Sequence, residues 1–203
     1  MAARSVRQCR TCLGTGAIIT GGEIDACPVC ARLAELGATL VDADVVAREV
    51  VAPGQPALAE IRAAFGDAMI AADGALDRAR MRRHVFADPA ERIRLEAILH
   101  PRIRTRMREL AAKAPGAYCV LAIPLLVESG GAYDWVDRVV VVDVPPDEQV
   151  RRLVARDGID ARLARDMVAA QVSRATRLAI ADEVLVNDGT LAELRERTDA
   201  LHA

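Results

Sequence analysis

Apolar and polar residues follow one another along this chain in two patterns, which predict different secondary structures. Residues 118–123 (YCVLAI) and 138–144 (RVVVVDV) are nearly continuous apolar runs that are rich in β-branched side chains. Such runs are typical of strands that are buried on both faces of a parallel sheet. Shorter apolar runs at 38–41 and 183–186 predict two further strands.

Helical periodicity fills the segments between these strands. The pattern predicts a helix over 29–36, which Gly37 ends, and further helices over 56–65, 77–86, 89–112, 146–157, 160–178 and from residue 191 onward. The alternation of strands and helices predicts an α/β fold, a doubly wound parallel sheet with flanking helices. In such a fold, ligands bind at the carboxyl ends of the strands.

The first 30 residues differ from the rest because they are rich in cysteine, glycine and threonine. Two Cys-x-x-Cys pairs, Cys9 with Cys12 and Cys27 with Cys30, have the residue type and spacing of a four-cysteine Zn²⁺ site. The alternatives are a redox dithiol pair, or sequence displaced by a gene fusion or a misassigned start. We therefore predict a small Cys-rich segment over 1–30 and an α/β domain over 31–203.

Composition and net charge exclude several classes of protein. Hydrophobic residues make up 52% of the 203 residues, which excludes a chain that is disordered by composition. A net charge of −2 argues against broad electrostatic binding of nucleic acids. No apolar run has the length of a membrane span, and the first residues lack the core of a signal peptide. We expect a soluble cytoplasmic protein without membrane contact, in which the Cys-rich segment is the candidate surface for a protein partner.

Several separated motifs carry a resemblance to a known family. In order, they are LAELGATLVDADVVAREVV (33–51), DGALDRARMRRHVFADP (73–89), ILHPRI (98–103), PLLVE (124–128), VVVVDVPPDEQVRRLVARDG (139–158) and ADEVLVNDG (181–189). Together they resemble the dephospho-CoA kinase family, which has a P-loop kinase fold. The resemblance implies transfer of the γ-phosphoryl group of ATP, with Mg²⁺, to the ribose 3′-hydroxyl of dephospho-CoA, the last step of coenzyme A biosynthesis.

Two aspartates are the candidate acid–base pair. Asp42 and Asp44 stand two residues apart at the end of a predicted strand, so both carboxylates are expected on one face. One carboxylate could accept a hydroxyl proton while the other supports it or a magnesium-bound water. The resemblance implies that Asp44 is the base. The alternatives are a solvated turn or a cap on the following helix.

Candidate nucleotide contacts lie in the second half of the chain. Arg152 and Arg156 are four residues apart on a predicted helix and therefore share a face. The resemblance places both in a lid over ATP, where guanidinium groups neutralise charge on the phosphoryl oxygens; the alternative is a solvated helix face. Asn187 is either an adenine contact or part of an ordinary Asn-Asp-Gly turn.

Four residues are candidate acceptor contacts through the resemblance alone. It places Pro124, Leu125 and Glu128 in a loop beside the acceptor substrate, after a buried strand. It places His100 in the helical substrate-binding region. Without the resemblance, Glu128 would be a surface residue and His100 a structural histidine.

One part of the family pattern is missing. A P-loop, Gly-x-x-x-x-Gly-Lys-Ser/Thr, cradles phosphates with backbone N–H groups and a lysine. Residues 18–22 (IITGG) resemble the family's first strand and loop opening, so Gly21 and Gly22 are candidate nucleotide contacts. Residues 23–28 (EIDACP) then stand where the rest of the loop belongs, and the only lysine of the chain, Lys113, is far away in sequence.

The replacement is electrostatically unfavourable for a triphosphate. Glu23 and Asp25 bring negative charge, and Pro28 lacks the N–H that a helix start could offer. We therefore expect a greatly weakened affinity for ATP. Three hypotheses follow: a working dephospho-CoA kinase, a catalytically impaired relative that keeps the scaffold, and a zinc-knuckle binding module fused to that scaffold.

Overall fold

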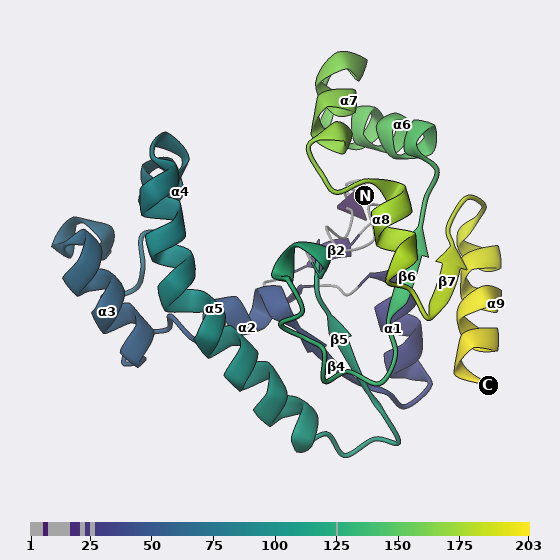
Figure 1. Cartoon of the computed structure of the whole chain (residues 1–203), viewed down its shortest axis with the longest axis horizontal. Coiled ribbons are helices and arrows are strands. Elements are labelled where there is room, and N and C mark those ends of the chain that lie inside the picture. Colours follow the sequence, from purple (N-terminus) through teal and green to yellow (C-terminus); the bar gives the residue numbers. More distant parts are fainter. Residues whose placement is uncertain (1–5, 8–16, 21–22, 25–26, 125) are drawn as a thin grey trace. The chain divides into compact units, whose positions relative to one another are not determined.

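The structure is a computed structural model that describes residues 6–7, 17–20, 23–24, 27–124 and 126–203. Figure 1 shows its course from the N-terminus to the C-terminus. The chain divides into two compact units, residues 1–40 with 116–203, and residues 41–115. Nowhere in these described ranges is there a helix long and apolar enough to cross a membrane.

The first unit contains the strands of an α/β fold and the helices that follow them. Its elements are β1 (Val6–Arg7), β2 (Ala17–Thr20), β3 (Glu23–Ile24), α1 (Pro28–Glu35), β4 (Thr39–Asp42, where the division falls), β5 (Cys119–Ala122), η2 (Val127–Ser129), β6 (Val140–Asp143), α6 (Pro146–Asp157), α7 (Ala161–Ala169), α8 (Arg174–Ala179), β7 (Glu183–Val186) and α9 (Leu191–His202).

The described strands form three small sheets. Strands β1, β2 and β3 pair antiparallel in that order, β4 pairs with β5, and β6 pairs with β7. Strands β6 and β7 run parallel, with Val140 opposite Glu183 and Asp143 opposite Val186. Their carboxyl ends therefore lie side by side, and the backbone N–H of Asn187 donates to the carbonyl of Asp143 (2.8 Å).

The core of the first unit lies between α1 and α9. Side chains from the start of α1 and from the C-terminal segment form one buried cluster: Cys27, Val29, Leu33, Ala38, Leu185 and Leu194. Val120 of β5 and Val142 of β6 pack against the same cluster. Burial of these aliphatic groups holds strands and helices together at about 25 cal/mol per Å² of apolar surface.

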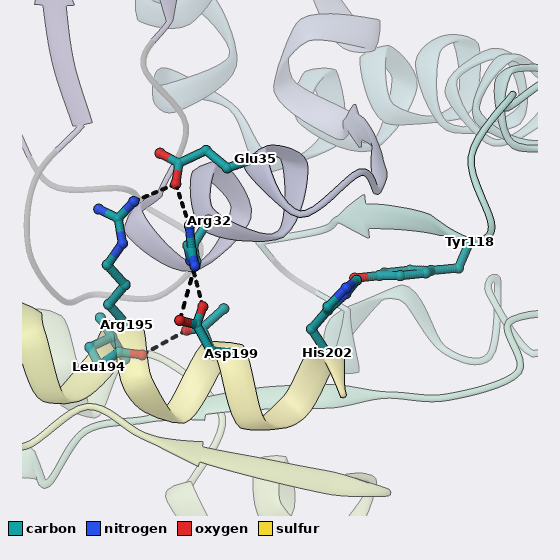
Figure 2. A network of polar contacts seen from close by, with 8 residues as sticks. Arg32, Glu35, Tyr118, Leu194, Arg195, Asp199 and His202 are labelled. Atoms are coloured by element: carbon teal, nitrogen blue, oxygen red, sulfur yellow. Dashed lines mark hydrogen bonds and ion pairs between the residues drawn. The ribbon is translucent and has the colours of Figure 1, made fainter.

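A network of ion pairs rims this core (Figure 2). The guanidinium of Arg32 on α1 donates through Nη2 to Asp199 on α9 (3.0 Å) and through Nη1 to Glu35 (2.9 Å). Arg195 of α9 also binds Glu35. The network therefore fixes how α9 sits along α1.

The turn after α1 is closely packed. Gly37 has a φ of +100° and ends the helix, as the sequence predicts. A Cβ atom on Gly116 would lie 2.7 Å from the carbonyl oxygen of Gly37 and 3.3 Å from Oγ1 of Thr39. Two residues on, the carbonyl of Tyr118 accepts a hydrogen bond from the Thr39 N–H (3.2 Å).

Gly116→Ala is therefore expected to destabilise the first unit. The nearest neighbour of the added methyl group is a backbone oxygen, which cannot rotate away, so we expect a loss of about 1–3 kcal/mol. Denaturant unfolding followed by circular dichroism measures the change. Ala117→Ser, at the exposed neighbouring position, is the control and should unfold like the native chain. Equal midpoints for both variants would contradict the close approach.

The second unit is helical. It contains α2 (Ala43–Glu49), α3 (Pro56–Phe65), η1 (Asp67–Met69), α4 (Arg78–Ala87) and α5 (Pro89–Ala112). Aspartate side chains cap α2, α4 and α5 at their N-termini. The core of this unit consists of Val51, Ala57, Ile61, Met69 and Met81.

Most predicted elements are present, and two expectations were wrong. The helix predicted over 160–178 is two helices, α7 and α8, because Ser173 caps a new start. Helix α2 was foreseen only in the alternative that an aspartate caps a following helix. The strand predicted over 138–144 is shorter, and Val140 is 40% exposed, because β6 pairs with β7 alone among the described strands. The boundary near residue 30 stays a prediction, since most of residues 1–30 lie outside the described part.

Candidate functional site

A cluster of buried polar side chains lies where β6 and β7 end. Asp143 closes β6, Asn187 follows β7, and Gln149 and Arg152 stand on α6, which begins three residues after β6. These four side chains are between 2% and 7% exposed. Buried polar groups at the carboxyl ends of parallel strands are where an α/β fold binds ligands.

The carboxylate of Asp143 anchors α8 to this edge. Arg174 donates to it through Nη2 (2.5 Å to Oδ2) and through Nε (2.9 Å to Oδ1). Hydrogen bonds to Asp143 raise the pKa of Arg174, which therefore stays charged. Asp143 is thus a structural partner for an arginine.

Arg152 is buried although it belongs to a charged helix. Its Nε donates to Oε1 of Glu148 (2.6 Å), and its Nη1 is buried without a hydrogen-bond partner. The pKa of Asp188 is lowered mainly by its hydrogen bond from Arg197, and the positive charge of Arg152 makes a smaller contribution. Because Arg152 is only 7% exposed, the alternative of a solvated helix face is wrong for this residue.

Two amides at the same edge also have unpaired atoms. Nε2 of Gln149 donates to the carbonyl of Val144 (2.6 Å), whereas its Oε1 is buried without a partner. Nδ2 of Asn187 is likewise buried and unpaired. In the part of the chain that the structure describes, these two atoms and Nη1 of Arg152 are the buried side-chain polar atoms that lack a partner. Each such unpaired atom lowers the stability of the folded protein by about 1–3 kcal/mol unless a ligand or a water molecule forms a hydrogen bond with it.

Arg156 lies one turn beyond Arg152 on α6, so the two residues share a helix face as predicted. Its Nε donates to Oδ1 of Asp157 (2.6 Å). Hydrogen bonding from Arg156 lowers the pKa of Asp157, which keeps the pair charged.

The two candidate catalytic aspartates, Asp42 and Asp44, have different positions in the second unit. Strand β4 ends at Asp42, whose carboxylate caps α2 by accepting from the N–H groups of Asp44 (2.7 Å) and Val45 (3.3 Å). Asp44 is exposed in the first turn of α2. The expectation that strand geometry at the end of β4 sends both carboxylates to one face was wrong, because the chain becomes a helix directly after Asp42. The cap that sequence analysis kept as an alternative is present at Asp42, and its site role stays a prediction.

Comparison with known proteins identifies the family. The sequence profile of dephospho-CoA kinase matches residues 12–193. A curated dephospho-CoA kinase of Thiobacillus denitrificans is 53% identical over 172 residues, 84% of this chain and 85% of that protein. One of Xanthomonas oryzae pv. oryzae is 49% identical over 191 residues, 93% of this chain and 92% of that protein. The chain belongs to the dephospho-CoA kinase family.

Solved structures of other proteins support the same fold. A protein of Thermus thermophilus superposes with a TM-score of 0.68 at 29% identity, covering 85% of this chain and 87% of that one. The dephospho-CoA kinase of Campylobacter jejuni, at 24% identity, has the same fold, with a TM-score of 0.66 over 86% of this chain and 88% of that one. The α/β prediction is confirmed.

The other residues predicted from the dephospho-CoA kinase resemblance are spread over both units. His100 is exposed on α5, and its carbonyl accepts from Nε of Arg104 (3.2 Å). Glu128 is exposed on η2, and Pro124 is half-buried just before it. Leu125 lies outside the described residues. The structure assigns no ligand contact to these four, so their roles stay predictions.

The N-terminal candidates are described only in part. Cys9, Cys12, Gly21 and Gly22 lie outside the described residues. Cys27 is the buried N-cap of α1, and Cys30 is half-buried in its first turn. Among described residues, no group of three or more His, Cys, Asp or Glu side chains could hold a metal.

Gln149 is the residue of this edge that sequence analysis missed. Its motif, Pro-Pro-Asp-Glu-Gln, reads as the start of a helix, and burial is a property of the folded unit. A signal was present all the same, because a glutamine in the first turn after a buried strand can reach back to the strand's last carbonyls.

Replacing Glu148 tests how Arg152 is held. Hydrogen bonds from Arg151 first, and then from Arg152, hold the pKa of Glu148 at about 2 against desolvation. A carboxylate whose pKa is lowered by folding stabilises the protein above its unfolded pKa, and loses this effect as pH falls toward the folded value. Glu148→Gln should therefore cost about 1–2 kcal/mol at pH 7 and progressively less below about pH 4.5.

Thermal unfolding between pH 7 and pH 3.5 measures this difference. Glu196→Gln on α9 is the matched control, since no ion pair of this carboxylate is present in the described structure. If Glu148→Gln lowered the stability by the same amount at every pH, the charge of the Glu148 carboxylate could not be the cause.

Proposed function

We propose that this chain is a cytoplasmic ATP-dependent dephospho-CoA kinase whose phosphate-binding half is weakened. The observation that carries the proposal is the identity of about half the residues with curated dephospho-CoA kinases over most of both chains. The match includes the Asp42–Asp44 segment, α6 and the turn after β7. The acceptor is dephospho-CoA, and the reacting group is its ribose 3′-hydroxyl.

Asp44 is the general base of the proposed reaction. Its carboxylate accepts the proton of the 3′-hydroxyl, whose oxygen forms a bond to the γ-phosphorus of ATP as the bond to the bridging β–γ oxygen breaks and ADP leaves. The cap formed by Asp42 fixes the backbone N–H of Asp44 and so positions the base. Both carboxylates offer oxygen atoms of the kind that Mg²⁺ prefers, and the ion would neutralise phosphate charge.

The edge formed by β6, β7 and α6 is the proposed nucleotide side. Arg152 and Arg156 supply guanidinium groups toward the phosphoryl oxygens, and Asn187 contacts the adenine. Burial of Arg152, with Nη1 unpaired, supports this assignment, because such a group is stabilised when an acceptor arrives. His100, Pro124, Leu125 and Glu128 belong to the proposed acceptor side.

The weakened part is the first strand-to-helix turn. A P-loop would supply an amide cradle from Gly21 and Gly22 onward and a lysine, whereas residues 23–28 read EIDACP. Helix α1 begins at Pro28, so its first residue has no N–H to offer a phosphate. Loss of one preorganised donor costs about 3–4 kcal/mol of transition-state stabilisation, and here several are missing.

Rebuilding the loop tests the proposal. In the rebuilt variant, residues 23–28 are replaced by a segment without acidic residues that completes Gly-x-x-x-x-Gly-Lys-Ser from Gly21. We expect kcat/KM for dephospho-CoA phosphorylation to rise at least about 100-fold, because the donors are restored. A coupled assay of ADP release measures it.

A control variant and two contradicting outcomes make the test decisive. Adding Asp44→Asn to the rebuilt variant should lower kcat at least about 100-fold while leaving binding of dephospho-CoA by calorimetry intact. A rebuilt variant that neither binds dephospho-CoA nor phosphorylates it would refute the function. A native chain as fast as the rebuilt one would refute the weakened loop alone.

We also propose that Cys9, Cys12, Cys27 and Cys30 bind one Zn²⁺ ion, which would make the N-terminal segment a surface for a protein partner. Support comes from the two Cys-x-x-Cys spacings and from the placement of Cys27 at the N-cap and Cys30 in the first turn of α1. The segment would then be a binding module on the kinase scaffold. A redox dithiol pair is the competing interpretation.

Metal analysis separates these two interpretations. We expect about one equivalent of zinc in the purified chain, because four thiolates complete a tetrahedral site. Cys9→Ser should remove most of it, whereas Cys119→Ser on β5 should retain it. A zinc-free chain whose thiols oxidise reversibly in pairs would favour the redox interpretation.

A further inference from the structure

Strand β7 has one edge that no described strand covers. In the part of the chain that the structure describes it pairs with β6 alone, and Figure 1 shows it between β6 and α9. A strand directs the backbone groups of alternate residues to its two opposite sides. The N–H groups of Glu183 and Asn187 donate to carbonyls on the β6 side (3.1 Å and 2.8 Å). The backbone groups of Val184 and Val186 therefore face the other edge.

One of these outward groups already has a partner. Nη1 of Arg197 on α9 donates to the carbonyl of Val186 and to Oδ1 of Asp188 (2.9 Å). No described residue outside the pairing with β6 binds the N–H or the carbonyl of Val184, or the N–H of Val186. Such a row of backbone groups on an edge strand is the template to which a further strand can be added.

A groove beside this edge provides space for an added strand. Its volume is about 500 Å³, and it lies between the residues of β7 and the last turns of α9. On the α9 side it is lined by Arg197, Ala200 and Leu201. Ala200 is exposed and has only a methyl group, so it leaves the backbone of β7 accessible.

The charges along this edge are complementary to themselves. Asp182 and Glu183 stand where β7 begins, whereas Arg197 is bound to the backbone where β7 ends. If a second copy of the chain lay antiparallel along the edge, the acidic start of each β7 would lie across from the arginine of the other copy. A contact between identical surfaces around a two-fold axis requires this kind of self-complementarity.

The hydrogen-bonding groups are self-complementary in one register. With Val184 opposite Val184 of the second copy, the two residues exchange two N–H···O=C bonds. Val186 then lies opposite Asp182 of the second copy and donates its N–H to that carbonyl. This register does not need the Val186 carbonyl or the Asp182 N–H, which already bind Arg197 and the carbonyl of Val139. It therefore uses the unbound groups and breaks no existing bond.

We propose that the uncovered edge of β7 is a homodimer interface, at which two copies of this chain pair their β7 strands antiparallel around a two-fold axis. The two-stranded sheet of each copy would become half of a four-stranded sheet with the order β6-β7-β7-β6. The proposal is independent of phosphoryl transfer, because it concerns backbone groups of an edge strand and requires no nucleotide.

Sedimentation equilibrium of the full-length chain over a range of concentrations tests the proposal. We expect a reversible equilibrium between monomer and dimer. Val184→Lys should raise the dissociation constant of the dimer at least about 10-fold, because the register places the two new ammonium groups directly opposite each other. Val140→Lys, at a valine of β6 that is 40% exposed against 47% for Val184, is the matched control and should keep the native value.

A second pair of variants leaves β7 unchanged. Ala200→Gln fills the groove from α9 and should weaken the dimer at least about 3-fold, whereas Ala192→Gln, exposed on the same helix outside the groove, should not. A dimer that withstands either Val184→Lys or Ala200→Gln, or an assembly of more than two copies, would overturn the proposal. A monomer at every concentration would also overturn it, and would mean that the edge stays open or binds a strand of another protein.

Discussion

The packing of α1 against α9 is the constraint on which the rest of the first unit depends. Apolar side chains of α1, among them Val29 and Leu33, share a core with Leu185 and Leu194, and the pairing of Arg32 with Asp199 fixes the two helices lengthwise. These contacts come from side chains after residue 26, so they hold the start of α1 independently of the residues that precede it. The packing that defines the first unit therefore does not depend on the proposed change in the phosphate-binding loop.

Local signals made most of the fold predictable from the sequence. Pro56, Pro89 and Pro146 each stand at the first position of a helix, and Gly158 ends α6 with a left-handed φ. The failures have local causes as well. Helix α2 is only one or two turns long, so its periodicity is short, and it depends on the cap formed by Asp42. Exposure of strand residues could not be predicted, because it depends on which strands pair.

The candidate site was less predictable than the fold, because its distinguishing property is the burial of polar side chains, which only the folded unit determines. Spacing alone placed Arg152 and Arg156 on one helix face, yet only the folded unit makes Arg152 a buried cation with a free N–H group. Asp42 differs in the opposite way. The sequence suggested a carboxylate that supports the neighbouring base, whereas in the structure one of its oxygens accepts hydrogen bonds from two backbone N–H groups. Gln149 has no charge and belongs to no familiar motif, so its burial and its hydrogen bond to Val144 became visible only in the folded unit.

The charges at the proposed nucleotide edge have a consequence for the binding of phosphates. Arg152 pairs with Glu148 and Arg156 with Asp157, so each arginine that would meet a phosphate is already partly neutralised by a carboxylate of its own helix. In a kinase with a P-loop lysine and amide cradle, the loop binds the triphosphate first, and arginines need only complete the arrangement. Without the loop, phosphates have to compete with Glu148 and Asp157 for the same guanidinium groups.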